Sequence, residues 1–348
     1  MGIYLYSLIA LLGLSFFYRH NPKKYYSHIG FIIIFIIAAF RSEEIGNDLQ
    51  RYVQFFISGD TQGGLKGDLE WGYSGLSNIL RQFSDTSSWY IIATSILTLV
   101  PLYFFLTKNS HNPVFSLLLF FILVNGFGFF MTGIRQSIAL VGTLWAYDLF
   151  ENKKYIYSIG LILLASTIHS SALFCMLFLL ASLIIIENKK RALYIILLLS
   201  FITGFIARVD IFELLPLLGK LPGFSNIADL YSGYSDYYRN VLPNFNGLFL
   251  IIVPTSIFAF LAIKYIPNSV YSKLLYIGTV LTNIFASTPT IQRYFIYGTF
   301  LQILIIPSIF RFLKNEEKAI VIIIVSLLLY SFLFISLESN GIKNYSFR

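Results

Sequence analysis

The sequence predicts an all-α polytopic membrane protein with about 12 transmembrane helices. Of its 348 residues, 57% are hydrophobic and only 12% are charged, whereas about 25% are charged in soluble domains. The apolar residues form blocks that can cross a bilayer, which takes about 20 helical residues. These blocks are continuous runs of Ile, Leu and Phe without alternation, a pattern that excludes a transmembrane β-barrel.

Each apolar block defines one predicted span, and residues 3–17 form a retained span because no signal-peptide cleavage site follows them. The blocks lie at 3–17, 29–40, 89–106, 113–131, 134–150, 155–168, 171–186, 192–207, 244–263, 270–287, 294–310 and 319–336. Residues 155–186 are too many for one span, and lysines flank them on both sides. Cytoplasmic loops carry the excess of Lys and Arg, so this stretch must cross twice, with an outer apex at residues 167–171.

The same rule places both termini outside and predicts one domain over residues 1–348, with partly helical outer loops at about 41–88 and 208–243. The net charge of +8 therefore mostly orients the protein in the membrane and does not indicate a nucleic-acid partner. The single cysteine, Cys175, lies in the middle of a predicted span and provides neither a disulfide nor a thiolate metal site.

The kind of positive charge differs between the two predicted sides. Inner segments hold 11 Lys and 3 Arg, whereas outer segments hold 3 Lys and 8 Arg. Arginine binds phosphate oxygens through a planar, bidentate donor group. Arg41, Arg135, Arg208 and Arg293 lie at span ends, which is the depth of a lipid head group. We expect several of them to bind an anionic lipid, most simply a polyprenyl diphosphate. The alternative is that each extends toward the interface and pairs with a local carboxylate.

The first outer loop concentrates charge directly after the second span. Asp48 and Arg51 would share one face of a helix. Asp48 or Glu44 could accept the proton of a sugar hydroxyl, while Glu43 and Glu44 could instead hold a divalent ion. Further along, Glu70 is followed by two aromatic residues that are candidates for stacking on a sugar, or for an ordinary interfacial belt. These aromatic residues are Trp71 and Tyr73.

The fifth predicted span begins with Arg135 and Gln136 on the outer side. The N-terminus of a helix presents unpaired N–H groups and favours anions, so this position suits a phosphate. His169 occupies the apex of the 155–186 hairpin beside Ser170. It is a candidate base for a hydroxyl nucleophile or a donor to phosphate, and the structural alternative is a histidine that caps a helix. Ser170 lacks the surroundings of a covalent nucleophile.

The remaining candidate residues come from the second half of the chain. Residues 208–243 combine tyrosines with an arginine and predict a carbohydrate-binding platform, or an amphipathic re-entrant lid. The eleventh span begins with a cation and a phenol at the outer interface. These glycan-binding candidates are Tyr231, Tyr234, Arg239 and Tyr294, and Arg293 is the neighbouring diphosphate-binding candidate.

Four stations along the chain resemble the EpsG-like family of bacterial polysaccharide polymerases, within the broader Wzy O-antigen polymerase group. The stations are Phe40-Arg41 with Gly46-Asn47-Asp48 and Tyr52; Glu70-x-Gly72-Tyr73-x-x-Leu76; Ile134-Arg135-Gln136-x-Ile138-Ala139 with Leu164-Ala165 and His169-Ser170-Ser171-Ala172; and Arg293-Tyr294. The third station is the most specific. The first departs from the family pattern, because Asn47 stands where the family usually has Thr and Arg51 precedes Tyr52.

The resemblance implies a membrane glycosyltransferase with a GT-C-like fold in the bacterial cytoplasmic membrane. Such an enzyme transfers a glycan from polyprenyl diphosphate to the non-reducing end of another lipid-linked unit on the outer face, and undecaprenyl diphosphate leaves. Its partners are the donor, the acceptor and membrane lipid; binding of a chain-length regulator stays open. Arg135, Arg41 and Arg293 would bind the diphosphate, with His169 or Asp48 favoured as the base, and Glu44 open. We expect direct, inverting attack without a metal or cofactor.

Other classes of protein fit the sequence less well. An O-antigen ligase shares the outer arginines and differs mainly in its acceptor. A glycan flippase should show paired halves with charges near the bilayer midplane, whereas the ionisable residues here lie at span ends. A membrane acyltransferase would need a thioester donor, which does not call for cations at this depth. A non-catalytic scaffold would tolerate loss of every outer arginine.

Overall fold

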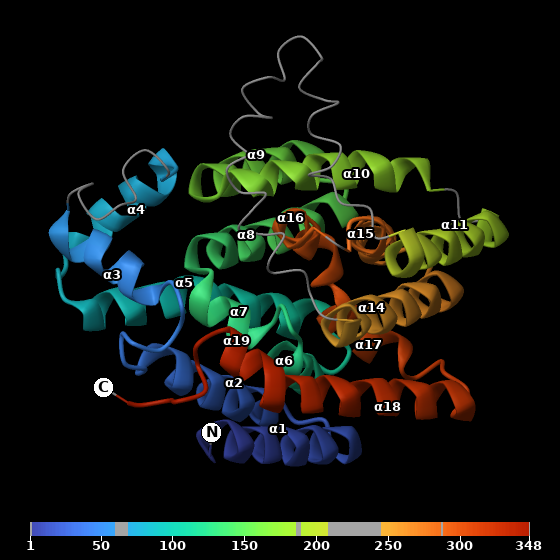
Figure 1. Cartoon of the computed structure of the whole chain (residues 1–348), viewed down its shortest axis with the longest axis horizontal. Helices are drawn as coiled ribbons and strands as arrows, with labels where there is room; N and C mark the ends of the chain where they lie inside the picture. The colour runs from blue at the N-terminus through green and yellow to red at the C-terminus, as the bar shows by residue number, and fades with distance from the viewer. Residues whose placement is uncertain (1, 60–68, 186–188, 208–244, 287, 348) are drawn as a thin grey trace, which may run out of the picture. The chain divides into compact units, whose positions relative to one another are not determined.

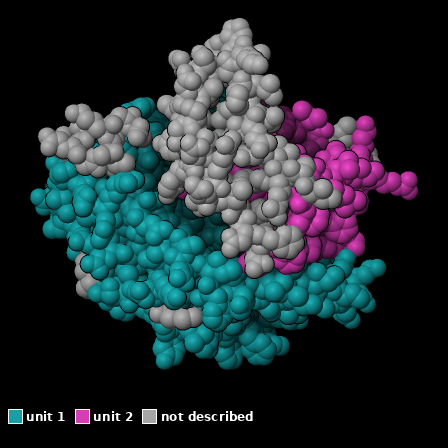
Figure 2. Space-filling view, viewed as in Figure 1, with its two compact units in different colours: residues 1–177, 302–348 teal, residues 178–301 magenta. Residues whose placement is uncertain are grey.

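The computed structural model describes residues 2–59, 69–185, 189–207, 245–286 and 288–347, and within them the chain is helical throughout (Figure 1). The predicted glycan-binding residues of the 208–243 loop lie outside the described residues; they are Tyr231, Tyr234 and Arg239. The described chain divides into two compact units, coloured separately in Figure 2. Unit 1 comprises residues 1–177 and 302–348, and unit 2 comprises residues 178–301.

Unit 1 holds most of the helices and both ends of the chain. Its first half contains α1 (Gly2–His20), α2 (Lys24–Ala39), α3 (Leu49–Ser58), α4 (Trp71–Arg81), α5 (Ser87–Asn109), α6 (Pro113–Ile122) and α7 (Phe127–Thr132). It continues with α8 (Ile134–Glu151), α9 (Tyr155–Ile168), the short 3-10 helix η1 (Ser170–Leu173), α17 (Gln302–Ile309), α18 (Asn315–Ser331), the π-helix η4 (Phe332–Ser336) and α19 (Leu337–Ser339). Helix α10 (Phe174–Ile184) runs from unit 1 into unit 2.

Unit 2 is built from α11 (Lys190–Ile202), the π-helix η3 (Thr203–Ala207), α14 (Phe245–Tyr265), α15 (Val270–Ile284) and α16 (Pro289–Thr299). A buried amide joins three of these helices. Asn283 of α15 donates to Ser200 Oγ of α11 at 3.2 Å and to Ser256 Oγ of α14 at 3.0 Å. Interhelical hydrogen bonds of this kind hold helices together in lipid, where apolar burial contributes little.

Most apolar blocks of the sequence coincide with helices, and residues 155–186 break at His169 as predicted. The blocks 113–131 and 294–310 differ, because each is divided between two helices, α6 and α7 in the first case and α16 and α17 in the second. Among the described residues, three helices are long and apolar enough to cross a membrane: Gly2–His20, Ser87–Asn109 and Asn315–Ser339. Several shorter apolar helices accompany them: Lys24–Ala39, Pro113–Ile122, Tyr155–Ile168, Ser170–Ile184 and Phe249–Tyr265. The predicted all-helical membrane architecture is therefore confirmed, while the number of twelve spans stays a prediction.

Five helices of unit 1 form a stack in which α5 and α8 run in the same direction. In Figure 1, α1, α2, α5, α8 and α9 follow one another from the bottom to the top of the view, and each packs against the next. The short helices α3 and α4 lie at one end of this stack, where α5 and α8 begin and α9 ends. Arg135 and His169 lie at the α3–α4 end of the stack, and Lys108 and Lys154 lie at the other end.

Helices α8 and α9 form a hairpin that places two predicted site residues at the same level. Their packing is close because small side chains face each other, with Ser158 Oγ donating to the carbonyl of Ala146 at 2.8 Å. The turn between them passes through Lys153, whose φ is 61°. Arg135 and His169 are almost equally distant from this turn along the chain, about 25 Å at 1.5 Å per residue. The hairpin therefore brings them together.

The C-terminal residues fold back onto the loop that follows α2. The backbone N–H of Gly46 donates to the carbonyl of Gly341 at 3.2 Å, and Asn47 Nδ2 donates to that of Ser339 at 2.7 Å. Tyr4 of α1 donates to the carbonyl of Ile342 at 2.8 Å. Segments from both ends of unit 1 thus fix the loop that follows α2.

Gly46 offers a test of this packing. Its φ of 118° is a conformation that side chains rarely adopt, and a Cβ there would lie 2.8 Å from the Met131 carbonyl oxygen. We expect Gly46→Ala to lower the free energy of unfolding by about 1–3 kcal/mol. Gly13→Ala is the control, because nothing lies within 4 Å of its Cβ and helical Ala is favoured over Gly. Thermal unfolding in detergent measures both, and equal melting temperatures would contradict the assignment.

Candidate active site

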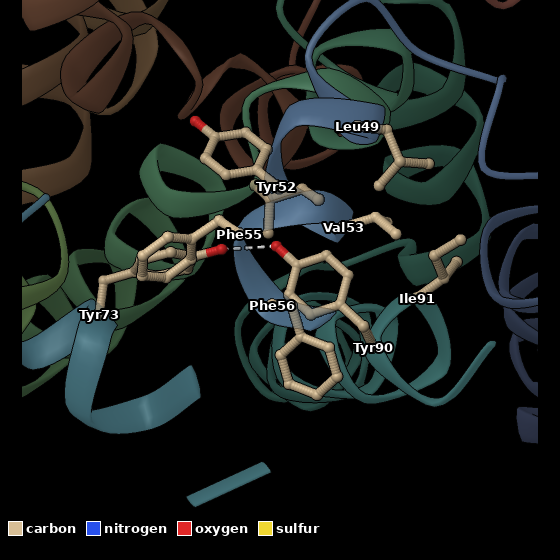
Figure 3. Packing of buried hydrophobic residues seen from close by; sticks show 9 residues of the cluster. Leu49, Tyr52, Val53, Phe55, Phe56, Tyr73, Tyr90 and Ile91 are labelled. Atoms are coloured by element: carbon tan, nitrogen blue, oxygen red, sulfur yellow. Dashed lines mark hydrogen bonds between the residues drawn. The ribbon is translucent and has the colours of Figure 1, made fainter. Parts of the chain in front are cut away.

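An aromatic cluster forms the base of the site at the α3–α4 end of unit 1 (Figure 3). It contains Leu49, Tyr52, Val53, Phe55 and Phe56 of α3, Tyr73 of α4, Tyr90 and Ile91 of α5, and Ile134 of α8. The hydroxyl groups of Tyr73 and Tyr90 share a hydrogen bond of 2.5 Å inside the cluster. The cluster fixes α3 and α4 against the start of α8, which is where Arg135 lies.

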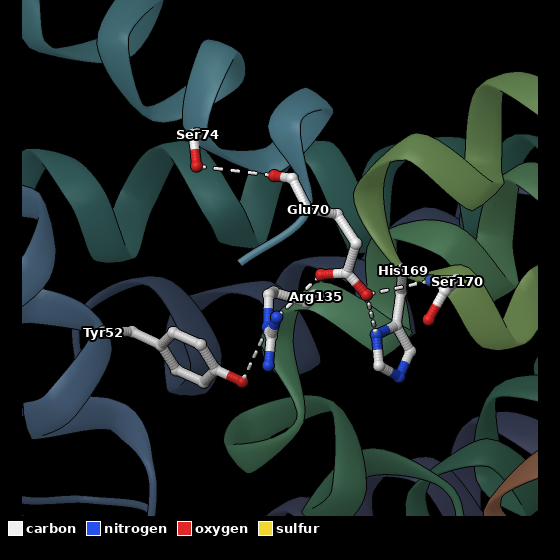
Figure 4. Close-up of polar contacts among 6 residues, drawn as sticks. All are labelled: Tyr52, Glu70, Ser74, Arg135, His169 and Ser170. Atoms are coloured by element: carbon white, nitrogen blue, oxygen red, sulfur yellow. Dashed lines mark hydrogen bonds and ion pairs between the residues drawn. The ribbon is translucent and has the colours of Figure 1, made fainter. Parts of the chain in front are cut away.

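Glu70 stands at the centre of the site and contacts two separate helices (Figure 4). One carboxylate oxygen, Oε2, lies 2.7 Å from Arg135 Nη1 at the start of α8. The other, Oε1, lies 3.0 Å from His169 Nδ1 and accepts the backbone N–H of Ser170 at 2.9 Å. One carboxylate therefore links an arginine, a histidine and the turn that follows α9.

Tyr52 and Tyr73 hold the arginine from the opposite side. Arg135 Nε donates to the Tyr52 hydroxyl at 3.3 Å, and the guanidinium lies 5.7 Å from the Tyr52 ring centre and 6.0 Å from the Tyr73 ring centre. Cation–π contacts of this kind contribute about 0.5–2 kcal/mol. With Glu70, they fix the position of the cation before any ligand binds.

The environment keeps Glu70 ionised. Burial of the carboxyl raises its pKa, but the hydrogen bonds from His169 and Ser170 and the charge of Arg135 outweigh burial and lower the pKa from 4.5 to about 2. An ionised carboxylate only accepts hydrogen bonds, so the proton of the shared bond belongs to His169 Nδ1. Neutral His169 then carries its lone pair on Nε2, which lies on the side of the ring away from Glu70 in Figure 4.

Arg135 and His169 are among the site residues that the sequence predicts, but Glu70 is not. Glu70 was noted as a carboxylate beside aromatic residues, and it opens one of the four stations. A carboxylate directly before an amphipathic helix is the signal that could have identified it. Its contacts span 65 residues to Arg135 and 99 to His169, and no pattern of sequence spacing encodes them.

Arg41 is buried at the same end of unit 1, with 2% of its surface exposed. Its Nη1 donates to the carbonyl of Ala38 in the last turn of α2, and its Nη2 donates to that of Met131 in α7 at 3.2 Å. Carbonyl groups at helix C-termini carry partial negative charge and favour a cation. Arg41 therefore holds two helix ends together, and its expected contact with a diphosphate stays a prediction.

The other candidates differ in exposure. Gln136 is 5% exposed and Tyr73 is 1% exposed, whereas Trp71 is 76% exposed at the start of α4. Asp48 is half-buried directly before α3, while Glu44 of the preceding loop and Arg51 of α3 are exposed. Arg293 and Tyr294 belong to α16 in unit 2. Whether these residues bind diphosphate or glycan stays a prediction. Among the described residues, no three His, Cys, Asp or Glu side chains form a group that could hold a metal ion.

The fold and the site together define a helical membrane protein with an Arg–Glu–His cluster at one end of its helices. The model of the EpsG family matches residues 24–347, so the chain belongs to the EpsG family. The family indicates a membrane polysaccharide polymerase of the glycosyltransferase type that acts on lipid-linked oligosaccharides. No curated protein and no solved structure matches the chain.

A substitution at Gly72 tests the close approach of α4 to α9, which brings Glu70 to the α8–α9 hairpin. A Cβ on Gly72 would overlap the side chain and carbonyl oxygen of Thr167 near the end of α9. We expect Gly72→Ala to displace α4 and to lower the free energy of unfolding by about 1–3 kcal/mol. Gly75→Ala, one turn further along α4, meets nothing within 4 Å and should be neutral or stabilising. Thermal unfolding of the two variants in detergent compares them, and similar losses would contradict the close approach of α4 to α9.

The depressed pKa of Glu70 predicts how stability depends on pH. The folded-state pKa of about 2 lies below the ordinary value, so the ionised carboxylate contributes stability above about pH 4.5, and this contribution is lost as pH falls toward 2. At pH 7, Glu70→Gln should lower the free energy of unfolding by about 1–3 kcal/mol, the range for hydrogen bonds to a charged group.

The measurement is the melting temperature of wild type and Glu70→Gln at pH values from 8 down to the lowest that the detergent allows. The difference should be constant between pH 8 and 6 and should narrow below pH 4.5. Glu43→Gln is the control, because Glu43 is exposed in the first outer loop. A difference that does not narrow in acid would show that Glu70 is not held ionised by its neighbours.

Proposed function

We propose that this protein extends a polysaccharide by transferring a glycan from polyprenyl diphosphate to the non-reducing end of a second lipid-linked unit. The observation that carries the proposal is the Glu70 carboxylate, which holds Arg135 and His169 together at one end of the apolar helices. A cation beside a histidine supplies both things that the reaction needs, charge stabilisation for the leaving diphosphate and a base for the acceptor hydroxyl. We place this end at the outer face of the bacterial cytoplasmic membrane.

In the proposed reaction, His169 Nε2 accepts the proton of the acceptor hydroxyl. The acceptor oxygen forms a bond to the anomeric carbon of the donor while the bond from that carbon to the diphosphate oxygen breaks. The electron pair leaves with the diphosphate, and the attack inverts the anomeric centre. Glu70 stabilises the imidazolium that forms, because its carboxylate already accepts the Nδ1 proton. Glu70 acts through His169 and is thus a positioning residue.

Arg135 stabilises the negative charge that builds on the leaving diphosphate. Arginine matches phosphate oxygens bidentately, and the contacts with Tyr52, Tyr73 and Glu70 hold its guanidinium in place. In this proposal the Tyr73 ring supports Arg135, while the exposed Trp71 is available to the glycan. Arg41 and Arg293 remain candidates for further diphosphate contacts, and Asp48 is the alternative base.

A diphosphate is a good leaving group, so fixed positive charge can replace a metal in this mechanism. An O-antigen ligase would use the same arginine and histidine with a different acceptor. Purified protein supplied with lipid-linked repeat units alone separates the two, because only a polymerase extends them. Extension that persists in EDTA would support the proposed metal-independent reaction, and extension that EDTA stops would overturn that part of the proposal.

Substitutions at Arg135 test the proposal directly. We expect Arg135→Ala to lower the rate about 100–1,000-fold, as for loss of one charged donor at the reacting centre. Arg135→Lys keeps the charge but loses the bidentate donor group, so it should retain only part of the activity. His169→Gln should also abolish long-chain polymer. Polymer length on a gel measures all three in cells that lack the wild-type protein.

Arg81→Gln is the matched control, because Arg81 lies in the last turn of α4 and its side chain contacts Asn78 instead of the site. It should leave polymer length unchanged. The amount of each variant in the membrane is compared by immunoblot, so that loss of protein is not mistaken for loss of activity. Long-chain polymer in both Arg135 variants, at normal protein levels, would remove Arg135 from the mechanism and overturn the proposal.

A further inference from the structure

A second polar site lies at the opposite end of α8, far from Arg135. There the ends of α5 and α8 and the start of α9 enclose a hollow of about 540 Å³, a volume typical of small-molecule sites. It is lined by Lys108, Trp145, Asp148, Leu149, Asn152, Lys154 and Leu161. Asp148 and Arg135 are separated by 13 residues of α8, which is about 20 Å along the helix. The hollow therefore lies at the opposite end of α8 from the Arg135 site. Lys108 lies in the last turn of α5, which is long and apolar enough to cross a membrane and begins at the α3–α4 end.

One wall of the hollow is fixed by an ion pair. Lys108 Nζ of α5 lies 2.6 Å from Asp148 Oδ2, and Asp148 is buried with 4% of its surface exposed. The same ammonium group lies 5.4 Å from the centre of the Trp145 ring, and Trp145 Nε1 donates to the carbonyl of Pro101 at 3.1 Å. These contacts tie α5 to α8 and set the position of one cation at the rim.

The rim is cationic and the deeper wall is apolar. Lys108 balances Asp148, so Lys154 gives the lining residues a net positive charge. Lys154 also directly precedes α9, and the positive end of that helix adds to the same field. Leu161 lies almost two turns into α9, and Leu149 and Trp145 continue the apolar lining along α8. A molecule that fits this site has an anionic head and an apolar body.

The surface around the hollow indicates that its occupant comes from the bilayer. Helix α9 exposes Ile156, Ile159 and Leu163, and Phe104 of α5 is 58% exposed. Exposed apolar side chains on the helices of a membrane protein face acyl chains. Lys and Trp at the border of this surface are the residue types found at the level of the head groups.

We propose that this hollow binds the head group of an anionic phospholipid, in the leaflet opposite to the one that faces Arg135 and His169. The lipid phosphate lies between Lys108 and Lys154, and the first part of an acyl chain lies along Leu149 and Leu161. This proposal depends on the hollow formed by α5, α8 and α9 and not on the chemistry proposed for Arg135. Each of the two proposals can therefore fail without the other.

Native mass spectrometry of the full-length protein in detergent tests the site, with phosphatidylglycerol and phosphatidylcholine of the same acyl chains as probes. We expect wild type to bind phosphatidylglycerol preferentially. Lys154→Gln should weaken this binding about fivefold, the factor that corresponds to ~1 kcal/mol for a basic residue near an anionic lipid. Lys153→Gln is the matched control: it removes the neighbouring charge, which is not part of the lining, and should change binding less than twofold.

A second variant tests the hollow itself. Leu161→Trp fills the apolar wall and should remove the preferential binding of phosphatidylglycerol while Lys108 and Lys154 stay in place. Where that variant does not purify as folded protein, the comparison of Lys154→Gln with Lys153→Gln decides alone. Equal weakening by these two substitutions would overturn the proposal. Displacement of the lipid by an equal concentration of glycerol 3-phosphate would also overturn it, because it would define a site for free phosphate.

Discussion

The ion pair of Glu70 with Arg135 and the hydrogen bond of Glu70 with His169 determine the geometry of the candidate site. It joins the start of α4 to both helices of the α8–α9 hairpin, so one carboxylate connects three segments that the chain order keeps apart. A carboxylate with two charged or polar neighbours stays ionised at low dielectric because its hydrogen bonds repay the cost of burial. Without it, the guanidinium and the imidazole would be positioned only by their own helices.

The apolar pattern predicted most of the long apolar helices because hydrocarbon admits few alternatives to a continuous helix. The split of residues 155–186 is a good example, since the flanking lysines required an even number of crossings and the structure ends α9 at Ile168. The pattern did not predict which helices are neighbours, because side chains facing lipid and side chains facing protein are equally apolar. It also gave no sign that residues 339–347 return to the first outer loop, since those contacts use mainly backbone groups.

The site was predictable in part. Arg135 stood out because it lies at the N-terminus of a predicted helix, and His169 because it lies at the apex of a predicted hairpin. Their nearly equal distances along the chain from the turn at Lys153 could have shown that they meet. Glu70 did not stand out, because it lies in an outer loop where carboxylates are ordinary. Arg41 shows the converse: its position at a span end suggested a ligand, whereas in the structure its guanidinium donates to carbonyl groups of α2 and α7. Charge at a given depth identifies candidate residues, and only packing shows what each one binds.

The return of the C-terminal residues to the loop after α2 has a consequence for biosynthesis. Asn47 and its partner Ser339 are 292 residues apart, and ribosomes add about 5–20 residues per second. The loop must therefore wait roughly 15–60 s after its own synthesis before the segment that completes it emerges. During that interval the early helices can already be in the bilayer, while the loop after α2 still lacks its contacts with residues 339–341. The contacts of Gly46 and Asn47 with residues 339–341 can form only after that late segment has left the ribosome.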